Sequence, residues 1–197
     1  MFVKAPRPGW VKTRIAQTAG PARACAIYRE LVATVLGRLQ SLRDVQLRFS
    51  PDDALDEIKP WLQPGWSAEG QGPGDLGERL ERAFAAAFAG GAERVIIVGS
   101  DCPEVEARDI RRAWSELRAH DVVVGPAVDG GYWLIGLRAA QAELFRDVAW
   151  SSEQVLAQTL ARAKSLRLRM QLLRILSDID TEADWDAHVR ERELPQR

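Results

Sequence analysis

The chain has 197 residues, of which 46% are hydrophobic and 28% charged, as expected for a folded globular protein rather than a disordered one. Its formal net charge of −1 argues against nucleic acid or an anionic membrane as a partner, so any anion site must be built locally. The two cysteines lie far apart in sequence and have no metal-ligand spacing. No apolar run approaches the roughly 20 residues that cross a bilayer, and no secretory signal is present. We therefore expect a cytoplasmic protein with no membrane span and no nucleic-acid partner.

Short apolar runs alternate with amphipathic stretches, a pattern that predicts strands alternating with helices around a mostly parallel sheet. The predicted strands are 1–4, 45–50, 66–69, 95–98, 122–124, 131–137 and a segment within 166–176. The predicted helices are 21–42, 51–62, 76–89, 107–117, 151–164 and 182–192. The first predicted strand has four residues where about five or six are usual, so either it is short or the sequence begins a few residues late. No repeat or linker divides the pattern, and we expect one domain spanning 1–197.

A basic loop follows the first predicted strand, at residues 4–14 (KAPRPGWVKTR). It carries four cations within eleven residues and is stiffened by Pro6 and Pro8. Ligands of open α/β sheets bind at the carboxyl ends of the strands, so a phosphate clamp would lie here. Lys12 and Arg14 could neutralise a diphosphate, with Arg14 bonding two oxygens at once. The loop matches neither the Walker nor the GxGxxG pattern, and the alternative is a solvated basic loop.

Asp101 follows the most clearly predicted strand, residues 95–98, within the turn 99–103 (GSDCP). Glycine and proline hold such a turn, and the carboxylate would point into the ligand crevice. There it could bind Mg²⁺ or Mn²⁺ that bridges nucleotide phosphates. The alternative is a turn or capping aspartate, but acidic residues at 104, 106 and 109 already serve the next helix start.

The segment 125–132 (GPAVDGGY) predicts a turn between two strands, and Asp-Gly alone would give a type I′ hairpin. The doubled glycine, Gly130 and Gly131, would let a ligand approach the backbone, and the aromatic residues that follow offer a stacking surface. Asp129 could orient an acceptor hydroxyl or act as a general base. On the sequence alone, turn geometry explains the segment equally well.

The segment 177–185 (SDIDTEADW) contains a helix start in which Thr181 and Asp184 form a near capping box. That role leaves Asp178 and Asp180 unused, and either could be a second carboxylate on the metal. The alternative is a solvated acidic turn.

Two helix starts give weaker signals. Residues 74–79 (GDLGER) could present backbone amides to a base, ribose or phosphate, or could simply form a cap at Asp75. Residues 150–154 (WSSEQ) include Glu153, which is either a candidate base or a first-turn acid favoured by the helix dipole.

Five of these segments together resemble the DUF2064 family of nucleotide-diphospho-sugar transferase-like proteins with the GT-A fold. They occur in the family's order and span almost the whole chain: 4–14 (KAPRPGWVKTR), 71–79 (QGPGDLGER), 99–103 (GSDCP), 129–132 (DGGY) and 178–181 (DIDT). The resemblance implies a three-layer α/β/α sandwich, with a mostly parallel mixed sheet, that binds a nucleoside diphosphate through a divalent metal. It places Asp101 where the metal-binding acid of GT-A enzymes lies.

The reaction expected on this resemblance is sugar transfer from a nucleotide sugar to a small-molecule acceptor whose identity the sequence leaves open. Mg²⁺ or Mn²⁺ would be held by Asp101 with Asp178 or Asp180, and Asp129 or Glu153 would serve the acceptor. The residues expected to bind the nucleotide are Lys4, Lys12, Arg14, Gly74, Asp75, Arg79, Ser100, Gly130 and Gly131.

Two alternatives stay open. Several of these motifs also resemble those of phospholactate guanylyltransferases and molybdenum-cofactor nucleotidyltransferases. These enzymes release pyrophosphate from a nucleoside triphosphate. The chain lacks the glycine-rich opening loop of the molybdenum-cofactor enzymes, which weakens the resemblance to them. The resemblance to the guanylyltransferases is not affected. The second alternative is a nucleotide-binding regulator that keeps the fold without turnover.

Overall fold

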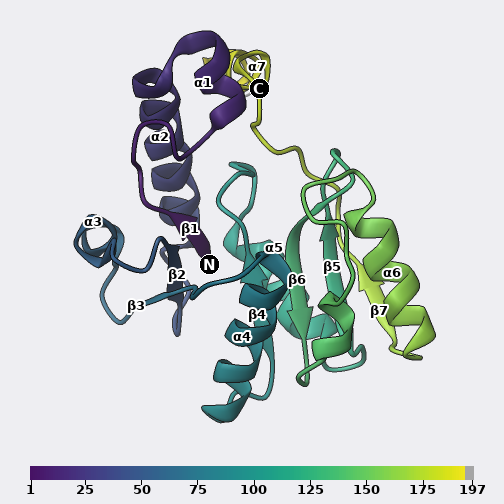
Figure 1. The fold of residues 1–197 in the computed structure, drawn as a ribbon. Coiled ribbons are helices and arrows are strands. Elements are labelled where there is room, and N and C mark those ends of the chain that lie inside the picture. Colours follow the sequence, from purple (N-terminus) through teal and green to yellow (C-terminus); the bar gives the residue numbers. More distant parts are fainter. Residues whose placement is uncertain (194–197) are drawn as a thin grey trace.

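The computed structural model describes residues 1–193 as a mixed α/β fold with two groups of strands (Figure 1). The first sheet is parallel, in the order β1 (Phe2–Lys4), β2 (Gln46–Ser50), β3 (Ser67–Gly70). The second has the order β4 (Val95–Val98), β6 (Tyr132–Leu137), β5 (Val122–Pro126), β7 (Met170–Leu172). Within it β6 runs antiparallel to both neighbours, while β7 is parallel to β5.

Seven α-helices and two 3₁₀ turns are present in the described residues. The α-helices are α1 (Thr13–Ala19), α2 (Pro21–Leu39), α3 (Leu55–Ile58), α4 (Leu76–Ala89), α5 (Ala107–Glu116), α6 (Val155–Ser165) and α7 (Glu182–Glu193). The 3₁₀ turns are η1 (Lys59–Trp61) and η2 (Ala142–Phe145). No helix in this part of the chain combines the length and apolarity that a membrane crossing requires.

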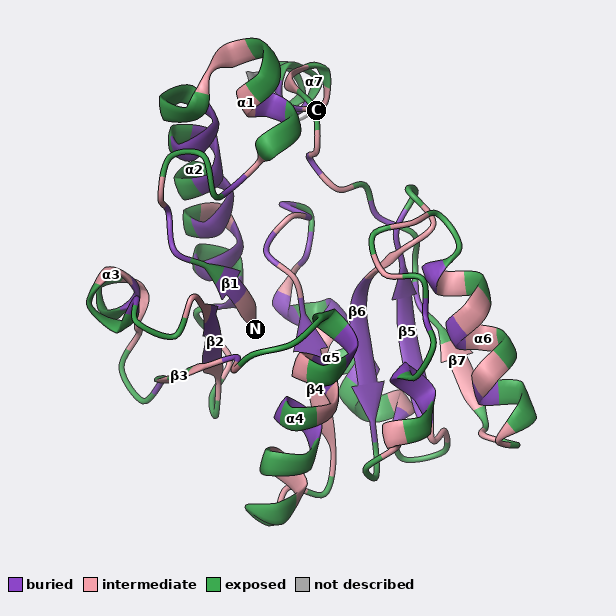
Figure 2. Ribbon diagram, in the orientation of Figure 1, coloured by how far each residue is buried: buried purple, intermediate pink, exposed green. Residues whose placement is uncertain are grey.

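Alternating side chains of the second sheet pack into two different cores, because successive residues of a strand point to opposite faces. Val123 and Leu134 join the cluster that contains residues of α2 and α5. Val124 and Ile135 join the cluster formed with α4, η2 and α6. The buried central strands β5 and β6 lie between these helices in Figure 2. This gives the three-layer α/β/α arrangement that the family resemblance implies.

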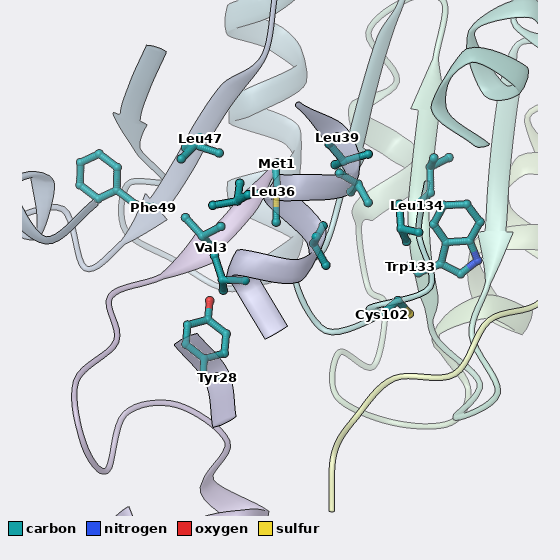
Figure 3. Packing of buried hydrophobic residues seen from close by; sticks show 14 of the residues in the cluster. Met1, Val3, Tyr28, Leu36, Leu39, Leu47, Phe49, Cys102, Trp133 and Leu134 are labelled. Carbon is teal, nitrogen blue, oxygen red and sulfur yellow. The ribbon is translucent and has the colours of Figure 1, made fainter. Parts of the chain in front are cut away.

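The first sheet packs against the core cluster that also contains Val123 and Leu134. Val3 of β1 and Leu47 of β2 pack with Leu36 and Leu39 of α2, as Figure 3 shows. Tyr28, from the preceding turns of α2, lies at the edge of this cluster near the end of β1. The short strand β1 is therefore held by side-chain packing as well as by its ladder with β2.

A third cluster joins the two ends of the chain. Ile15 of α1 and Ile27 of α2 pack against Ile179 and Trp185, and Trp185 lies on α7. Figure 1 shows α7 beside α1 and α2, far along the chain from both. This packing brings the segment before α7 to the loop that follows β1.

The predicted strands are confirmed to within a few residues, but three helix predictions were wrong in their limits. The predicted helix 51–62 forms only α3 and η1, since Pro60 interrupts the helical hydrogen bonds. The predicted helix 151–164 begins only at Val155, because Ser151 adopts a left-handed conformation (φ 65°). Helix 21–42 ends at Leu39, and α1 was not predicted at all.

Candidate functional site

A cavity of about 940 Å³ lies at the carboxyl ends of β1 and β4. Its walls come from all six segments singled out in the sequence, which approach from different elements of both sheets. All residues predicted to act in the site line this cavity except Gly130. The sheet therefore brings the predicted residues together, although their individual roles remain predictions.

Lys12 occupies the floor of the cavity. It has a left-handed backbone conformation (φ 46°) at the position before α1, and only 5% of its side chain is exposed. Its ammonium group forms an ion pair with Asp101, and its Nζ lies 3.5 Å from Oδ1 of Asp180. Arg14, which is 67% exposed, approaches the same Asp180 carboxylate at 3.1 Å. Two of the four cations of the basic loop thus contact the acidic segments: Lys12 pairs with Asp101 and Asp180, and Arg14 with Asp180 alone.

The protonation of Lys12 follows from these contacts. Burial alone would lower the pKa of its ammonium group, since the charged form loses hydration. The attraction and hydrogen bond of Asp101 oppose this, with further attraction from Asp180 and Asp178, and the net result is a raised pKa. Lys12 therefore carries its charge throughout the physiological range, although its own side chain is almost completely buried.

Asp178 lies in a different environment. Burial raises its pKa to about 6, while the hydrogen bond from the Cys102 thiol opposes that rise and the charge of Asp101 adds to it. The pKa of Cys102 is also raised, by burial and then by Asp178, so the thiol keeps its proton and acts as the donor. Cys102, for which no role was predicted, thus lines the cavity as the hydrogen-bond partner of Asp178.

The acidic segment is held in place by hydrogen bonds that leave the Asp180 carboxylate unused. Oδ2 of Asp184 accepts hydrogen bonds from the backbone N–H groups of Asp180 (3.1 Å) and Thr181 (2.8 Å). The Thr181 hydroxyl in turn accepts from the Asp184 N–H at 3.2 Å, which confirms the predicted cap of α7. Asp180 consequently points its carboxylate at Lys12 and Arg14.

The predicted metal ligands Asp101, Asp178 and Asp180 do not form a ready-made metal centre in the described residues. Among residues 1–193, no three His, Cys, Asp or Glu side chains converge closely enough to hold a metal ion. Oxygen donors such as Asp101 and Asp180 suit Mg²⁺ or Mn²⁺, but the Lys12 ammonium lies between them as the shared cation. The donor chemistry fits such an ion if Lys12 turns from the carboxylates to another anion.

The β5–β6 connection spans 127–131, rather than the two residues of a type I′ turn. Oδ1 of Asp129 accepts a hydrogen bond from the Gly131 N–H at 2.9 Å, which leaves Oδ2 directed elsewhere. Gly130 has a φ of 86°, and a Cβ built on it would lie 2.1 Å from the backbone oxygen of Glu153. Gly130 thus allows the β5–β6 connection to pack closely against the segment at Glu153. Asp129 and Glu153 both line the cavity.

The start of α4 closes another side of the cavity. Asp75 and Glu78 form a capping box, as predicted, with the Asp75 side chain accepting from the Glu78 N–H at 2.9 Å. Arg79 is half-buried: it donates hydrogen bonds to the Gly74 carbonyl (2.9 Å) and to the hydroxyl of Ser50 (3.3 Å).

Tyr28 and Trp150 are among the lining residues to which the sequence analysis assigned no role. The buried hydroxyl of Tyr28 accepts a hydrogen bond from the Lys4 N–H at 2.7 Å and lies 3.2 Å from the Ser100 hydroxyl. Trp150 packs edge-on against Tyr132, with ring centroids 6.5 Å apart, and its indole touches Gly77. Tyr28 lies at helical spacing among apolar residues, so nothing in the pattern separates it from an ordinary core residue.

Comparison with known families and structures identifies relatives. A family model described as "Uncharacterized protein conserved in bacteria (DUF2064)" matches residues 35–152. A crystal structure from Desulfovibrio desulfuricans G20, provisionally described as a nucleotide-diphospho-sugar transferase, is 33% identical, covers 99% of this chain and 87% of its own, and has a TM-score of 0.90. No curated protein matches the sequence.

More distant structures share the fold alone. A 4-diphosphocytidyl-2C-methyl-D-erythritol synthase from Anaerococcus prevotii is 10% identical, with 96% of both chains covered and a TM-score of 0.60. Rv0371c of Mycobacterium tuberculosis H37Rv, in complex with manganese, is 15% identical, with 96% of both chains covered and a TM-score of 0.59.

Proposed function

The chain belongs to the DUF2064 family of bacterial proteins, and on that premise we propose that it is a transferase acting on a nucleotide substrate. More specifically, we propose that it moves a sugar from a nucleoside-diphosphate donor to a small-molecule acceptor. The provisional description of the D. desulfuricans relative supports the donor class.

One observation carries this proposal: a buried, charged Lys12 faces Asp101 and Asp180 at the floor of a cavity large enough for a nucleotide. Ligand cavities of this kind range from about 300 to 1,000 Å³. Lys12 and Arg14 give the floor two cations, although the whole chain carries a formal net charge of −1. A diphosphate is the ligand that best matches cations presented together with metal-binding carboxylates.

In this reaction the bond between the anomeric carbon and the diphosphate oxygen breaks, and the acceptor oxygen forms the new bond to that carbon. The nucleoside diphosphate leaves with the electron pair, so negative charge grows on its terminal phosphate. Lys12 and Arg14 would neutralise that charge as it develops, and the burial of Lys12 would strengthen its share of the interaction.

The proton of the acceptor hydroxyl needs a base if the acceptor attacks directly. Asp129 and Glu153 both line the cavity, and we propose that one of them accepts this proton. Asp129 has one carboxylate oxygen occupied by the Gly131 N–H, which fixes its orientation and leaves the other oxygen for the acceptor.

Mg²⁺ or Mn²⁺ would be held by Asp101 together with Asp178 or Asp180, and when bound it would supply positive charge to the diphosphate. Lys12 would then leave the carboxylates for the phosphate oxygens. The manganese complex of Rv0371c supports testing Mn²⁺ first, although that protein shares only the fold.

A product analysis tests the proposal. The purified protein is incubated with Mn²⁺, a panel of nucleotide sugars and nucleoside triphosphates, and mixed small-molecule acceptors. Release of nucleoside diphosphate with consumption of a nucleotide sugar is expected. Pyrophosphate release from a triphosphate would instead establish nucleotidyl transfer, and nucleotide binding without product under any condition would identify a regulator.

The metal site has a test that does not require turnover. In calorimetry, Asp101→Asn is expected to abolish the Mn²⁺-dependent part of nucleotide diphosphate affinity and to leave the metal-free part in place. Glu116→Gln, at the end of α5 and outside the cavity lining, is the matched control. Unchanged Mn²⁺-dependent affinity in Asp101→Asn would remove this residue from the site.

A further inference from the structure

A row of three polar groups joins the two sheets at the wall of the proposed active-site cavity. The backbone N–H of Lys4, at the end of β1, donates a hydrogen bond of 2.7 Å to Oη of Tyr28, which lies on α2. Oη of Tyr28 also lies 3.2 Å from Oγ of Ser100, in the turn after β4. All three residues line the cavity. The phenol of Tyr28 therefore bridges the carboxyl ends of two strands that belong to different sheets.

Packing holds Tyr28 in this position. Only 2% of the residue is exposed, and its ring packs edge-on against Trp61, with ring centroids 6.4 Å apart. In Figure 3 the hydroxyl group of Tyr28 points toward β1. Burial raises the pKa of Tyr28 above its ordinary value, so the phenol keeps its proton at neutral pH. Tyr28 is thus a neutral hydroxyl group with one proton to donate.

The direction of the hydrogen bond between the two hydroxyl groups follows from the partners that surround them. The Lys4 N–H can only donate, so it occupies one acceptor position of the Tyr28 oxygen. In residues 1–193, no hydrogen bond joins the Tyr28 hydroxyl to any acceptor other than Ser100. If Ser100 were the donor, the proton of a buried phenol would have no partner, which costs about 1–3 kcal/mol. Tyr28 is therefore the donor and Ser100 the acceptor.

This direction leaves the proton of Ser100 to be donated into the cavity. Ser100 is only 5% exposed but lines the cavity, and the described chain offers its hydroxyl group no hydrogen-bond partner besides Tyr28. The turn that carries Ser100 is held by the backbone bond of 3.0 Å from Ile179 N–H to Asp101 O. Because its oxygen already accepts from Tyr28, the hydroxyl group of Ser100 is a hydrogen-bond donor with a fixed direction.

We infer that Ser100 donates a hydrogen bond to a phosphate oxygen of the bound diphosphate, and that Tyr28 is the positioning residue that fixes this donor. The ligand class rests on the proposed function, whereas the direction of the bond between Tyr28 and Ser100 does not. A phosphate oxygen is a charged acceptor, so it matches a hydroxyl group that can only donate. A neutral ligand hydroxyl could accept the same bond, but a bond to a charged oxygen is roughly twice as strong. Lys12 thus supplies charge to the diphosphate and Ser100 supplies orientation.

Calorimetry with inorganic pyrophosphate in the presence of Mn²⁺ tests the donor without turnover. Ser100→Ala is expected to weaken pyrophosphate affinity by about 10–100-fold, because a hydrogen bond to a charged group is lost. Ser100→Thr, which keeps a hydroxyl group, should bind close to the parent. Ser115→Ala, at an exposed position of α5 outside the cavity lining, is the matched control. A Ser100→Ala variant with the affinity of the parent would overturn the proposal.

A double-mutant cycle tests the role of Tyr28. Tyr28→Phe removes the proton that orients Ser100, so it should weaken pyrophosphate binding in the parent but not in the Ser100→Ala background. An equal loss of affinity in both backgrounds would mean that Tyr28 does not act through Ser100, and would exclude the positioning role. Failure of the parent itself to bind pyrophosphate would contradict the diphosphate site of the proposed function, and with it the ligand class.

The direction of the hydrogen bond has a readout that requires neither a ligand nor the phenylalanine variant. The chain has only two tyrosines, so protein labelled with ¹³C at the tyrosine Cζ gives two resonances, which Tyr132→Phe assigns. Donation of the phenol proton increases electron density on the oxygen and moves the Cζ resonance downfield, as complete ionisation does. Ser100→Ala should therefore move the Tyr28 resonance upfield and leave that of Tyr132 in place. A downfield movement, or none, would show that Tyr28 is not the donor and would overturn the proposal.

Discussion

The backbone N–H of Ile179 donates a hydrogen bond of 3.0 Å to the carbonyl oxygen of Asp101. This bond joins the turn after β4 to the segment before α7, two stretches separated by almost eighty residues. Because it uses only backbone atoms, it fixes the distance between Asp101 and the flanking Asp178 and Asp180 without occupying any carboxylate. The acidic part of the site is thus positioned independently of the ligand it is proposed to bind.

Replacement of Lys12 by methionine should impair the reaction severely. It removes a buried cation placed to neutralise the departing diphosphate, and the loss of one comparable group costs about 10²–10³-fold in kcat. The measurement is steady-state kinetics on the donor identified by product analysis. Lys164→Met, an exposed residue of α6, is the matched control. A Lys12→Met enzyme within twofold of the parent would show that the ammonium has only a structural role.

Asp178 should make folding stability depend on pH in an unusual direction. Its pKa is raised to about 6 in the folded protein, above the ordinary value of 3.8, so the folded state holds the proton more tightly. Its contribution to the free energy of unfolding is therefore full below about pH 4 and is lost as pH rises to 6, by at most about 3 kcal/mol.

This contribution is isolated by urea unfolding of the parent and of Asp178→Asn between pH 4 and 7.5, with EDTA present. The difference in unfolding free energy should shift in favour of the asparagine variant as the pH rises. A difference that is constant across this range would show that Asp178 titrates normally.

Tyr28→Phe should destabilise the protein by about 1–3 kcal/mol. The substitution leaves the Lys4 N–H without its acceptor and the Ser100 hydroxyl without its buried neighbour. Tyr132→Phe is an informative control, because the Tyr132 hydroxyl is buried with no hydrogen-bond partner in the described part of the chain. Its removal should be neutral or slightly stabilising. Equal unfolding free energies for the two variants would contradict the assigned role of Tyr28.

Gly130→Ala and Gly91→Ala separate backbone strain from steric contact. Both glycines have positive φ angles, 86° and 91°, so alanine should cost about 1–2 kcal/mol at either position. Only at Gly130 would the new methyl group meet the Glu153 backbone, while nothing lies within 4 Å at Gly91. Calorimetric unfolding should show a further loss of about 1–3 kcal/mol in Gly130→Ala. Equal losses of unfolding free energy in the two variants would mean that the 150–153 segment moves away from the new methyl group at little cost.

Features that depend on local pattern were predictable from the sequence. The strand 95–98 and the position of Asp101 follow from an apolar run that ends in a turn, since strand ends of an open sheet form the ligand crevice. The capping boxes at Asp75 and Thr181 likewise depend on residues only three positions apart.

Features that depend on contacts between residues far apart in the sequence could not be predicted. Helix α1 has a single buried residue, Ile15, and a seven-residue helix of this kind is stable only through its packing against α2 and α7. Lys12 and Asp101 were each predicted to lie in the site, for phosphate and for metal. Their pairing could not be predicted, because it requires the left-handed backbone at Lys12 and the position of the β4 turn together.

The cluster that joins Ile15, Ile27, Ile179 and Trp185 has a consequence for the order in which the site appears during synthesis. The basic loop at 4–14 emerges from the ribosome well before its acidic counterpart at 178–180. Domains usually begin to fold as they emerge, so the sheets can form around an incomplete site. A nascent chain stalled before α7 would therefore resemble the finished protein in secondary structure, yet lack the carboxylates that its cations face.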